Sequence, residues 1–282
     1  MSGLDLRVPL AGTWLVRRIR ELLDPLELRL ARDVTEQVPP RRLRARTGVP
    51  EARAFIASGR DAARELEGAL ASSGLGLAEV ESVLDFGCGP GRVLPHVASL
   101  VAPASCTGCD VSGPAIKWAR RHRPELRWEV SRFRPPLPFG DGSFALVYSI
   151  SVFSHIDEEL QDRWLEEIDR VLRPGGVALL SVHGRHAFDQ FRTGQATTRW
   201  SARSAFSRGP LGDGEFVFVP YRPSAWIRNE LPGVQGEFGL AFHDERYVRQ
   251  HWSRTFEVVQ ILPRAMTAWQ DIVVVRKRPA QG

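Results

Sequence analysis

The sequence has no run of eighteen consecutive apolar residues, although 43% of its 282 residues are hydrophobic. A transmembrane helix needs about 20 such residues in a row. The amino-terminal region also lacks the basic flank and the unbroken apolar stretch that mark a secretory signal. We therefore expect a cytoplasmic protein without a membrane span, with enough apolar residues for a large packed core.

Cysteine and lysine are also scarce. The three cysteines all fall in predicted strand–turn segments, where small apolar side chains pack. Cys106 and Cys109 are spaced like half of a zinc or redox motif, but no second pair of ligands with suitable spacing follows. We therefore expect no metal. Lysine occurs only as Lys117 and Lys277, so arginine carries the net charge of +5. Arginine clusters are more often solvated surfaces than phosphate sites.

The most informative segment that is present is an apolar run over residues 83–86 that breaks into Gly87, Gly89 and Gly91. The run indicates a buried parallel strand, and the glycines indicate a turn whose backbone can approach a ligand closely. A dinucleotide-binding fingerprint would place its third glycine at position 92, where this chain has Arg92. The pattern therefore argues against NAD and FAD.

A second acidic residue supports a nucleoside ligand. Residues 106–110 indicate the next strand, and Asp110 stands at its carboxyl end. A carboxylate at this place can accept hydrogen bonds from both hydroxyls of a ribose. Together with Asp85 and the glycine turn, it frames a site for a ligand with a ribose and no pyrophosphate.

These residues resemble the class I S-adenosylmethionine-dependent methyltransferases, whose first motif is similar to LDFGCGPG at residues 84–91. Further similarity lies, in the family's order, in the segments 137–139, 143–144, 146–150, 154–156 and 171–176. The resemblance covers about residues 80–183 and, more weakly, 243–278. It implies an α/β fold with a doubly wound, seven-stranded, mostly parallel, Rossmann-like sheet, and S-adenosyl-L-methionine as cofactor.

We expect an amino-terminal helical segment and an inserted cap around this core. Residues 1–79 are predicted as a helical flap and linker, with one helix near residues 14–23 and another from Pro50 to Ser73. Residues 80–183 and 243–278 form the predicted core, which ends in an antiparallel hairpin. Residues 184–242 lose periodicity and are rich in aromatics, which suggests a cap over an acceptor. The predicted strands of the core cover residues 82–86, 106–110, 126–130, 145–150, 177–183, 256–262 and 271–276. A helix is predicted at 157–172, with one buried stripe formed by Leu160, Trp164, Leu165, Ile168, Val171 and Leu172.

The resemblance assigns the cofactor to one edge of the sheet. The turn would hold the methionine part, Asp110 the ribose, and residues after the third strand the adenine. The family commonly has Asp or Asn there, whereas this chain has Ser131 and Arg132 followed by Phe133, so we expect backbone contacts and stacking on the ring. The predicted cofactor-binding residues are Asp85, Gly87, Cys88, Gly89, Gly91, Asp110, Val111, Ser131, Arg132, Phe133 and Ser149.

Two histidines are candidates for catalysis. His155 follows the fourth predicted strand and His183 ends the fifth, so both should lie at the cofactor edge. A hydroxyl acceptor must lose its proton, and imidazole is a suitable base near neutral pH. In small-molecule O-methyltransferases that this chain resembles, the position of His155 sometimes serves as the base. The structural alternative is that His155 caps the following helix and His183 packs against the turn at Gly184.

The sequence therefore predicts O-methylation of a small organic acceptor, such as a sugar, a glycan or a natural product. A nucleic-acid methyltransferase is one alternative, favoured by the basic composition. It is disfavoured because residues 149–153 lack the diproline motif typical of base N-methyltransferases. The other alternative is a scaffold that binds the cofactor without catalysis. We expect a small-molecule partner and no nucleic acid; the sequence does not determine the oligomeric state.

Overall fold

The computed structural model describes residues 38–101, 105–196, 209–222, 227, 231, 233, 234 and 236–279. The chain divides into two compact units, Met1–Ser58 and Gly59–Gly282. In the first unit, α2 (Arg41–Arg44) and a 3₁₀ turn (Ala45–Thr47) precede α3 (Ala52–Ala71), which continues into the second unit. The predicted helix near residues 14–23 lies outside the described residues.

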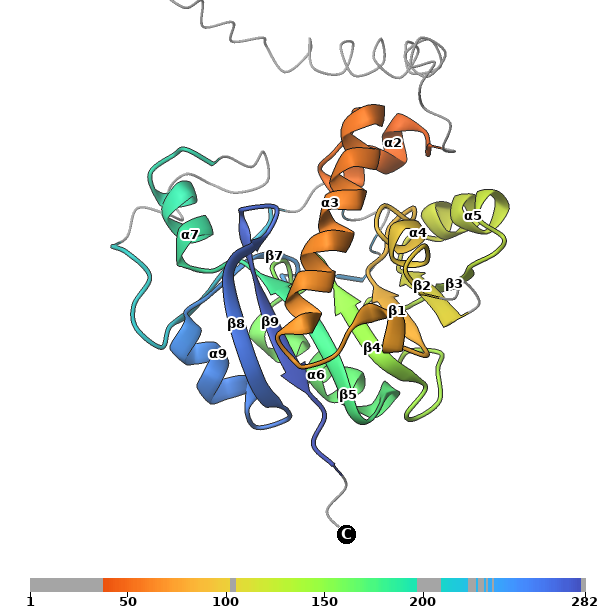
Figure 1. Ribbon diagram of the computed structural model, residues 1–282. Coiled ribbons are helices and arrows are strands. Elements are labelled where there is room, and N and C mark those ends of the chain that lie inside the picture. Colours follow the sequence, from red (N-terminus) through yellow and green to blue (C-terminus); the bar gives the residue numbers. More distant parts are fainter. Residues whose placement is uncertain are drawn as a thin grey trace, which may run out of the picture. The chain divides into compact units, whose positions relative to one another are not determined.

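The second unit contains a seven-stranded sheet in the order β3-β2-β1-β4-β5-β9-β8 (Figure 1). The first five strands in chain order are parallel, and β9 pairs antiparallel with both β5 and β8. This topology confirms the predicted doubly wound sheet with a closing hairpin. The strands are β1 (Val83–Phe86), β2 (Cys106–Asp110), β3 (Arg127–Val130), β4 (Phe144–Ser149), β5 (Leu172–Val182), β8 (Glu257–Met266) and β9 (Gln270–Arg276).

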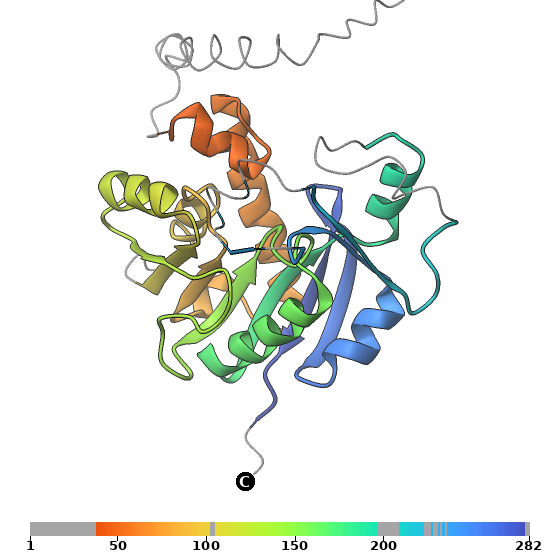
Figure 2. The ribbon, with the colours of Figure 1, turned by 180° about the vertical axis from the view of Figure 1, so that it is seen from behind.

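Helices cover both faces of this sheet. Because side chains alternate along a strand, Val83 and Leu84 of β1 enter two different core clusters. One cluster contains apolar residues of α3, of α4 (Leu94–Val97) and of α5 (Gly113–His122); the other contains those of α6 (Glu158–Val171) and α9 (Glu245–Trp252). Figure 2 shows α6 and α9 in front of the sheet in the view from behind. Among the described helices, none combines the length and apolarity that a membrane crossing requires.

Helix α6 matches the predicted apolar stripe. It begins after Asp157, whose carboxylate accepts a hydrogen bond from the Leu160 amide at 3.0 Å. Every residue predicted to face the core is buried: Leu160, Trp164, Leu165, Ile168, Val171 and Leu172. The following strand begins at Leu172, five residues before the predicted start. The strand starts earlier because Leu172 already pairs with Phe144 of β4. The register between β4 and β5 then shifts, and the extra residues of β5, among them Gly175 with its positive φ, form a bulge within the strand.

The region predicted as a cap carries its own small elements. They are α7 (Arg185–Arg192) and an antiparallel pair of strands, β6 (Phe216–Pro220) and β7 (Gly239–His243). Two isolated bridges join this region to the segments that follow β4 and β5. They pair Phe238 with Ile156 and Phe242 with His183. The predicted cap aromatics Trp200, Phe206 and Trp226 lie outside the described residues.

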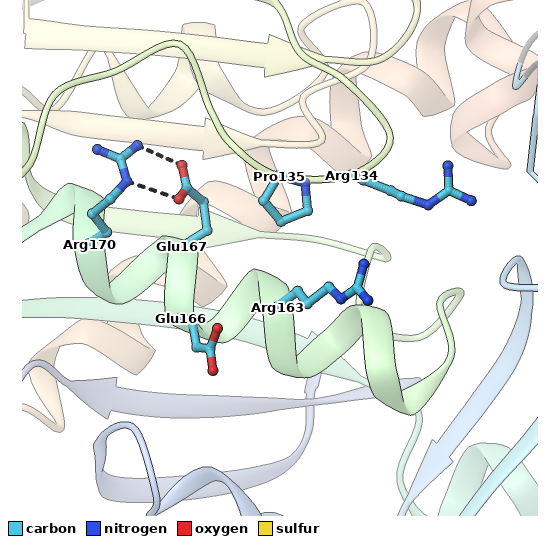
Figure 3. Close-up of a pocket in the computed structure, with 6 residues that line it drawn as sticks. All are labelled: Arg134, Pro135, Arg163, Glu166, Glu167 and Arg170. Carbon is cyan, nitrogen blue, oxygen red and sulfur yellow. Dashed lines mark hydrogen bonds and ion pairs between the residues drawn. The ribbon is translucent and has the colours of Figure 1, made fainter.

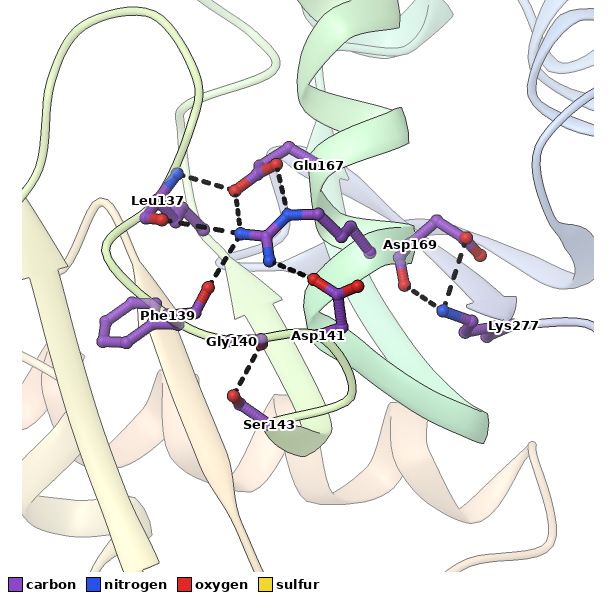
Figure 4. A network of polar contacts seen from close by, with 9 residues as sticks. Leu137, Phe139, Gly140, Asp141, Ser143, Glu167, Asp169 and Lys277 are labelled. Carbon is purple, nitrogen blue, oxygen red and sulfur yellow. Dashed lines mark hydrogen bonds and ion pairs between the residues drawn. The ribbon is translucent and has the colours of Figure 1, made fainter.

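A buried carboxylate fixes the connection between β3 and β4. Glu167 on α6 accepts a hydrogen bond from the Leu137 amide at 2.6 Å and is paired with Arg170 (Figure 4). Arg170 also donates to the Phe139 carbonyl and to Asp141. The Arg170 side chain is 31% exposed, whereas Glu167 is buried. A buried charge is tolerated when it is paired and its hydrogen bonds are made, as they are for Glu167.

Replacing Glu167 with glutamine should lower the free energy of unfolding by about 1–3 kcal/mol, because the charged partner of Arg170 and one hydrogen-bond acceptor are lost. Urea denaturation of the parent and the variant measures this difference. Glu166→Gln is the matched control, since Glu166 is its exposed neighbour. Equal stability of the Glu167→Gln and Glu166→Gln variants would contradict the prediction.

Candidate active site

The predicted glycine motif forms a tight turn after β1. The amides of Gly87 and Cys88 donate to the carbonyl oxygen of Cys109 at 2.8 and 3.0 Å, which ties the turn to β2. Gly87, Gly89 and Gly91 have φ values of 84°, 56° and 79°, a region that residues with a Cβ rarely adopt. The predicted turn is therefore confirmed.

The turn packs closely against two neighbouring segments. A Cβ atom on Gly87 would lie 2.3 Å from Cγ2 of Val152, in the loop that follows β4. A Cβ atom on Gly91 would lie 2.6 Å from the ring of Trp128 on β3. Glycine is required at both positions by these contacts, and the loop that carries His155 is held beside the turn.

Asp85 lies under the turn and is buried. Its carboxylate accepts a hydrogen bond at 2.9 Å from the hydroxyl of Tyr148, its register partner on β4. Burial raises the pKa of Asp85 to about 7, although the Tyr148 hydrogen bond and the positive charge of Arg92 oppose the rise. Asp85 therefore shares a buried polar cluster and changes its protonation near neutral pH.

The free energy of unfolding should fall as pH rises from about 4 to about 7 through the contribution of Asp85. The folded protein holds this proton up to a higher pH than the unfolded chain does, so deprotonation favours unfolding in that window. Asp85→Asn should remove this contribution. Urea denaturation at several pH values compares the slopes of the two proteins, and identical slopes would contradict the prediction.

Asp110 ends β2 beside the turn, as predicted. Its Oδ2 accepts a hydrogen bond from the Gly89 amide at 2.8 Å, and its Oδ1 accepts one from the Ser112 amide at 2.7 Å. Each carboxylate oxygen has a second lone pair, which leaves capacity for a ribose hydroxyl. The carboxylate thus shapes the turn as well as offering a ligand contact. Val111 follows it directly and is partly buried.

The three residues that the sequence analysis assigns to adenine follow β3 and differ in their exposure to solvent. Ser131 is buried and its amide donates to the Asp110 carbonyl at 3.0 Å. Arg132 is exposed, whereas Phe133 is partly buried and meets Phe238 edge-on at 6.4 Å between ring centroids.

Two buried hydroxyls fit a polar ligand at this edge of the sheet. Within the described residues, Oγ of Ser131 and Oγ of Ser149 have no hydrogen-bond partner. Ser131 follows β3 and Ser149 ends β4, so both stand at the carboxyl edge with Asp110. Buried polar groups in proteins are nearly always satisfied, and unsatisfied ones at a ligand edge are consistent with a bound nucleoside.

His155 is partly buried in the loop after β4, and its tautomer is fixed by its partners. Its Nδ1 lies 2.9 Å from the carbonyl oxygen of Gly239 and 2.9 Å from the hydroxyl of Tyr221. Because a carbonyl oxygen only accepts, Nδ1 carries the proton and Nε2 has the free lone pair. Burial lowers the pKa of His155, so this imidazole is neutral at pH 7.

The structure brings the second candidate histidine next to the first. His183 follows β5, is 4% exposed, and meets His155 edge-on with ring centroids 5.5 Å apart. Burial, together with the neighbouring histidines, lowers the pKa of His183 well below its ordinary value. Its ring lies among aromatic side chains, Phe191, Phe242 and Trp269.

Sequence reasoning did not place two residues of this cluster beside the histidines: Tyr221 was only one of the aromatic residues of the predicted cap, and Gln270 had no assigned role. Tyr221 and Gln270 contact His155 and His183, although they stand 66 and 87 residues away in the chain. One feature of the sequence could have indicated Gln270 as a site residue: it is a polar residue at the start of the apolar strand β9. A third histidine, His243, is buried and has a structural partner: its Nε2 lies 2.8 Å from Oε1 of Gln161.

Comparison with known proteins identifies the core. Residues 83–176 match the family model described as "Methyltransferase domain". The chain carries a methyltransferase domain. The seven-stranded sheet around this segment has the fold of solved methyltransferases.

Curated relatives of the methyltransferase domain differ in the acceptors that their names state. The tRNA N(3)-methylcytidine methyltransferase Mettl2 of Drosophila melanogaster is 34% identical over 168 residues, which are 56% of this chain and 48% of the relative. The trans-aconitate 2-methyltransferase of Delftia acidovorans is 31% identical over 166 residues, covering 58% and 59%. The fatty-acid O-methyltransferase of Mycolicibacterium smegmatis is 37% identical over 102 residues, covering 36% of each. The chain thus spans about half the length of such relatives, or less. Because the Drosophila relative is named as a tRNA methyltransferase, the predicted exclusion of a nucleic-acid partner has no support.

Solved structures share the fold of the methyltransferase domain. An S-adenosylmethionine-dependent methyltransferase from Clostridium acetobutylicum ATCC 824 gives a TM-score of 0.53 at 10% identity, covering 77% of this chain and 91% of that one. The PH0226 protein of Pyrococcus horikoshii OT3 gives 0.50 at 16% identity, covering 70% and 82%. At these identities the likeness concerns the fold alone.

A pocket of the methyltransferase domain lies between α6 and the connection from β3 to β4 (Figure 3). It measures about 430 Å³ and is lined by Arg134, Pro135, Arg163, Glu166, Glu167 and Arg170 (Figure 3). Arg134 is paired with Glu237, Arg163 with Glu159, and Arg170 with Glu167. Since each arginine already has a carboxylate partner, we assign this pocket a structural role.

Proposed function

We propose that the protein transfers the methyl group of S-adenosylmethionine to a hydroxyl oxygen of a small organic acceptor, such as a sugar, a glycan or a natural product. The observation that carries this proposal is the pair of neutral imidazoles, His155 and His183, whose ring centroids lie 5.5 Å apart. The loop of His155 packs on the glycine turn through Val152. The cofactor supplies a methyl group on a sulfonium centre. The protein must therefore hold the acceptor in line and receive its proton.

His155 has the properties of the proton acceptor. Its Nδ1 proton is committed to the Gly239 carbonyl, so the lone pair of Nε2 can accept a proton. Protonation of Nε2 would leave the Gly239 hydrogen bond in place and strengthen it. The loop of His155 packs on the turn through Val152 and Gly87, which favours a short path between the base and the transferred methyl group.

The cofactor contacts in this proposal follow the carboxyl edge. The turn from Gly87 to Gly91 offers its backbone to the methionine part, and Asp110 offers a carboxylate to the ribose. Ser131 and Ser149 offer hydroxyls that have no partner among the described residues. We propose that Phe133 contributes a ring surface beside the adenine, while the exposed Arg132 contributes through its backbone.

Transfer of a labelled methyl group from the cofactor tests this function. The full chain is incubated with separate pools of sugars and glycans, phenols, amines, and tRNA. We expect label in a hydroxyl-bearing small-molecule pool. Label in tRNA would replace the proposal with a nucleic-acid methyltransferase, as the Drosophila relative suggests. Cofactor binding by calorimetry without transfer to any pool would indicate a binding scaffold.

A further inference from the structure

Gln270 anchors a polar network beside the two histidines. It is the first residue of β9 and is 5% exposed. Its Oε1 accepts a hydrogen bond at 2.6 Å from the hydroxyl of Ser181, which lies on β5. The Ser181 oxygen in turn accepts a hydrogen bond from the Ser151 amide at 2.8 Å. This arrangement directs the oxygen of the Gln270 amide toward β5.

The nitrogen of the same amide faces the histidine. Nε2 of Gln270 donates to Oγ of Ser151 at 3.0 Å. It lies 3.3 Å from Nε2 of His183 and, at the longer distance of 3.4 Å, from Oγ of Ser154. An amide NH₂ group can only donate, so this contact is a hydrogen bond only when the ring nitrogen has a lone pair. Nε2 of His183 is then the acceptor and Nδ1 carries the proton. A backbone hydrogen bond with Ala241 acts on the same buried imidazole.

We propose that Gln270 is a positioning residue that holds His183 as the Nδ1–H tautomer, so that the Nε2 lone pair of His183 is occupied and His155 alone takes the proton of the acceptor. This proposal rests on the proposed function, in which His155 is the base. The two imidazoles then have different roles. His155 offers a lone pair to the hydroxyl proton, whereas the neutral ring of His183 packs edge-on against His155 and limits the orientations of that ring.

The same molecule contains a contrasting case. Both amide hydrogens of Gln161 are used, because its Nε2 donates to the carbonyl oxygens of Phe153 and Ile156 at 3.0 and 2.9 Å. Its Oε1 therefore faces His243 as an acceptor, and His243 carries its proton on Nε2. Two buried glutamines thus present opposite ends of their amides to two buried histidines, and opposite tautomers follow.

The backbone conformation of Ser151 also depends on the hydrogen bonds around Gln270. Ser151 has a φ of 61°, a conformation uncommon for a residue with a Cβ. That conformation is held by the hydrogen bond of its amide to Ser181 and by the contact of its hydroxyl with Gln270. Strained residues of this kind persist where the surroundings determine them, and they gather at functional sites.

Nitrogen-15 NMR of the histidine side chains tests the proposal without knowledge of the acceptor. We expect His155 and His183 to be protonated on Nδ1 and His243 on Nε2, with His183→Gln serving to assign the signal. Gln270→Glu places an acceptor opposite Nε2 and should move the His183 proton to that nitrogen. The variant should leave the His243 tautomer and the affinity for the demethylated cofactor unchanged.

Protonation of His183 on Nε2 in the parent protein overturns the assignment of the tautomer. A His183 proton that stays on Nδ1 in Gln270→Glu overturns the role of Gln270. If the tautomers are as expected but no hydroxyl compound is methylated, the proposed function fails while the role of Gln270 stands.

Discussion

Replacing His155 with asparagine should lower the rate of methyl transfer by about 10²–10⁴, the usual cost of losing a general base. Asparagine places its amide nitrogen near the position of Nδ1 and can keep the hydrogen bond to the Gly239 carbonyl. What it lacks is the lone pair of Nε2. The affinity for the cofactor, measured by calorimetry, should stay at the parent value, because the glycine turn and Asp110 are untouched.

The pH profile of the parent supplies an independent signature of the base. Since burial lowers the pKa of His155, activity should persist to more acidic pH than an exposed histidine would allow, and it should fall once the imidazole is protonated. His122→Asn is the matched control, because His122 lies on α5 with its Nδ1 2.8 Å from the Trp118 carbonyl. If the His155→Asn variant turns over at the parent rate across this range, transfer proceeds by positioning alone, as suffices for an amine that arrives neutral or for an acceptor that is already an anion.

Much of the core could be predicted because its signals are local. The glycine turn is specified by residues that follow one another, and positive φ at Gly87, Gly89 and Gly91 bears this out. The buried stripe of α6 repeats at helical spacing, and all of its predicted members are in the core. Asp110 could be placed because parallel strands end at one edge, so the position along the strand determines the position at the site.

The environment of the histidines depended on contacts between distant parts of the chain. The carbonyl of Gly239 stands 84 residues from His155, and the Gln270 side chain stands 87 residues from His183. A hydrogen bond of this kind leaves no periodic trace in the sequence. The histidines themselves could be found, whereas their tautomers required the structure. The early boundary of β5 was missed for a related reason, since its bulge depends on pairing with β4.

Replacing Asp110 with alanine should weaken binding of the cofactor by about 1.5–3 kcal/mol, the scale for hydrogen bonds left unmade around an ionised group. Calorimetry with S-adenosylmethionine and its demethylated product measures the loss. Two physical effects contribute in this structure. The variant removes an acceptor for the ribose hydroxyls, and it also leaves the amides of Gly89 and Ser112 without their carboxylate partner. Glu129→Ala is the matched control, since it deletes a carboxylate from the adjacent strand β3.

A ligand without the ribose hydroxyls separates these two effects. The Asp110→Ala substitution should cost less affinity for a 2′,3′-dideoxy analogue of the demethylated product than for the natural ligand. With the analogue, neither the parent nor the variant can make the ribose hydroxyl contacts. The remaining loss then measures the role of Asp110 in shaping the turn through Gly89. An equal loss for both ligands would mean that Asp110 acts only through the turn. Unchanged affinity for the natural ligand would remove Asp110 from the cofactor site altogether.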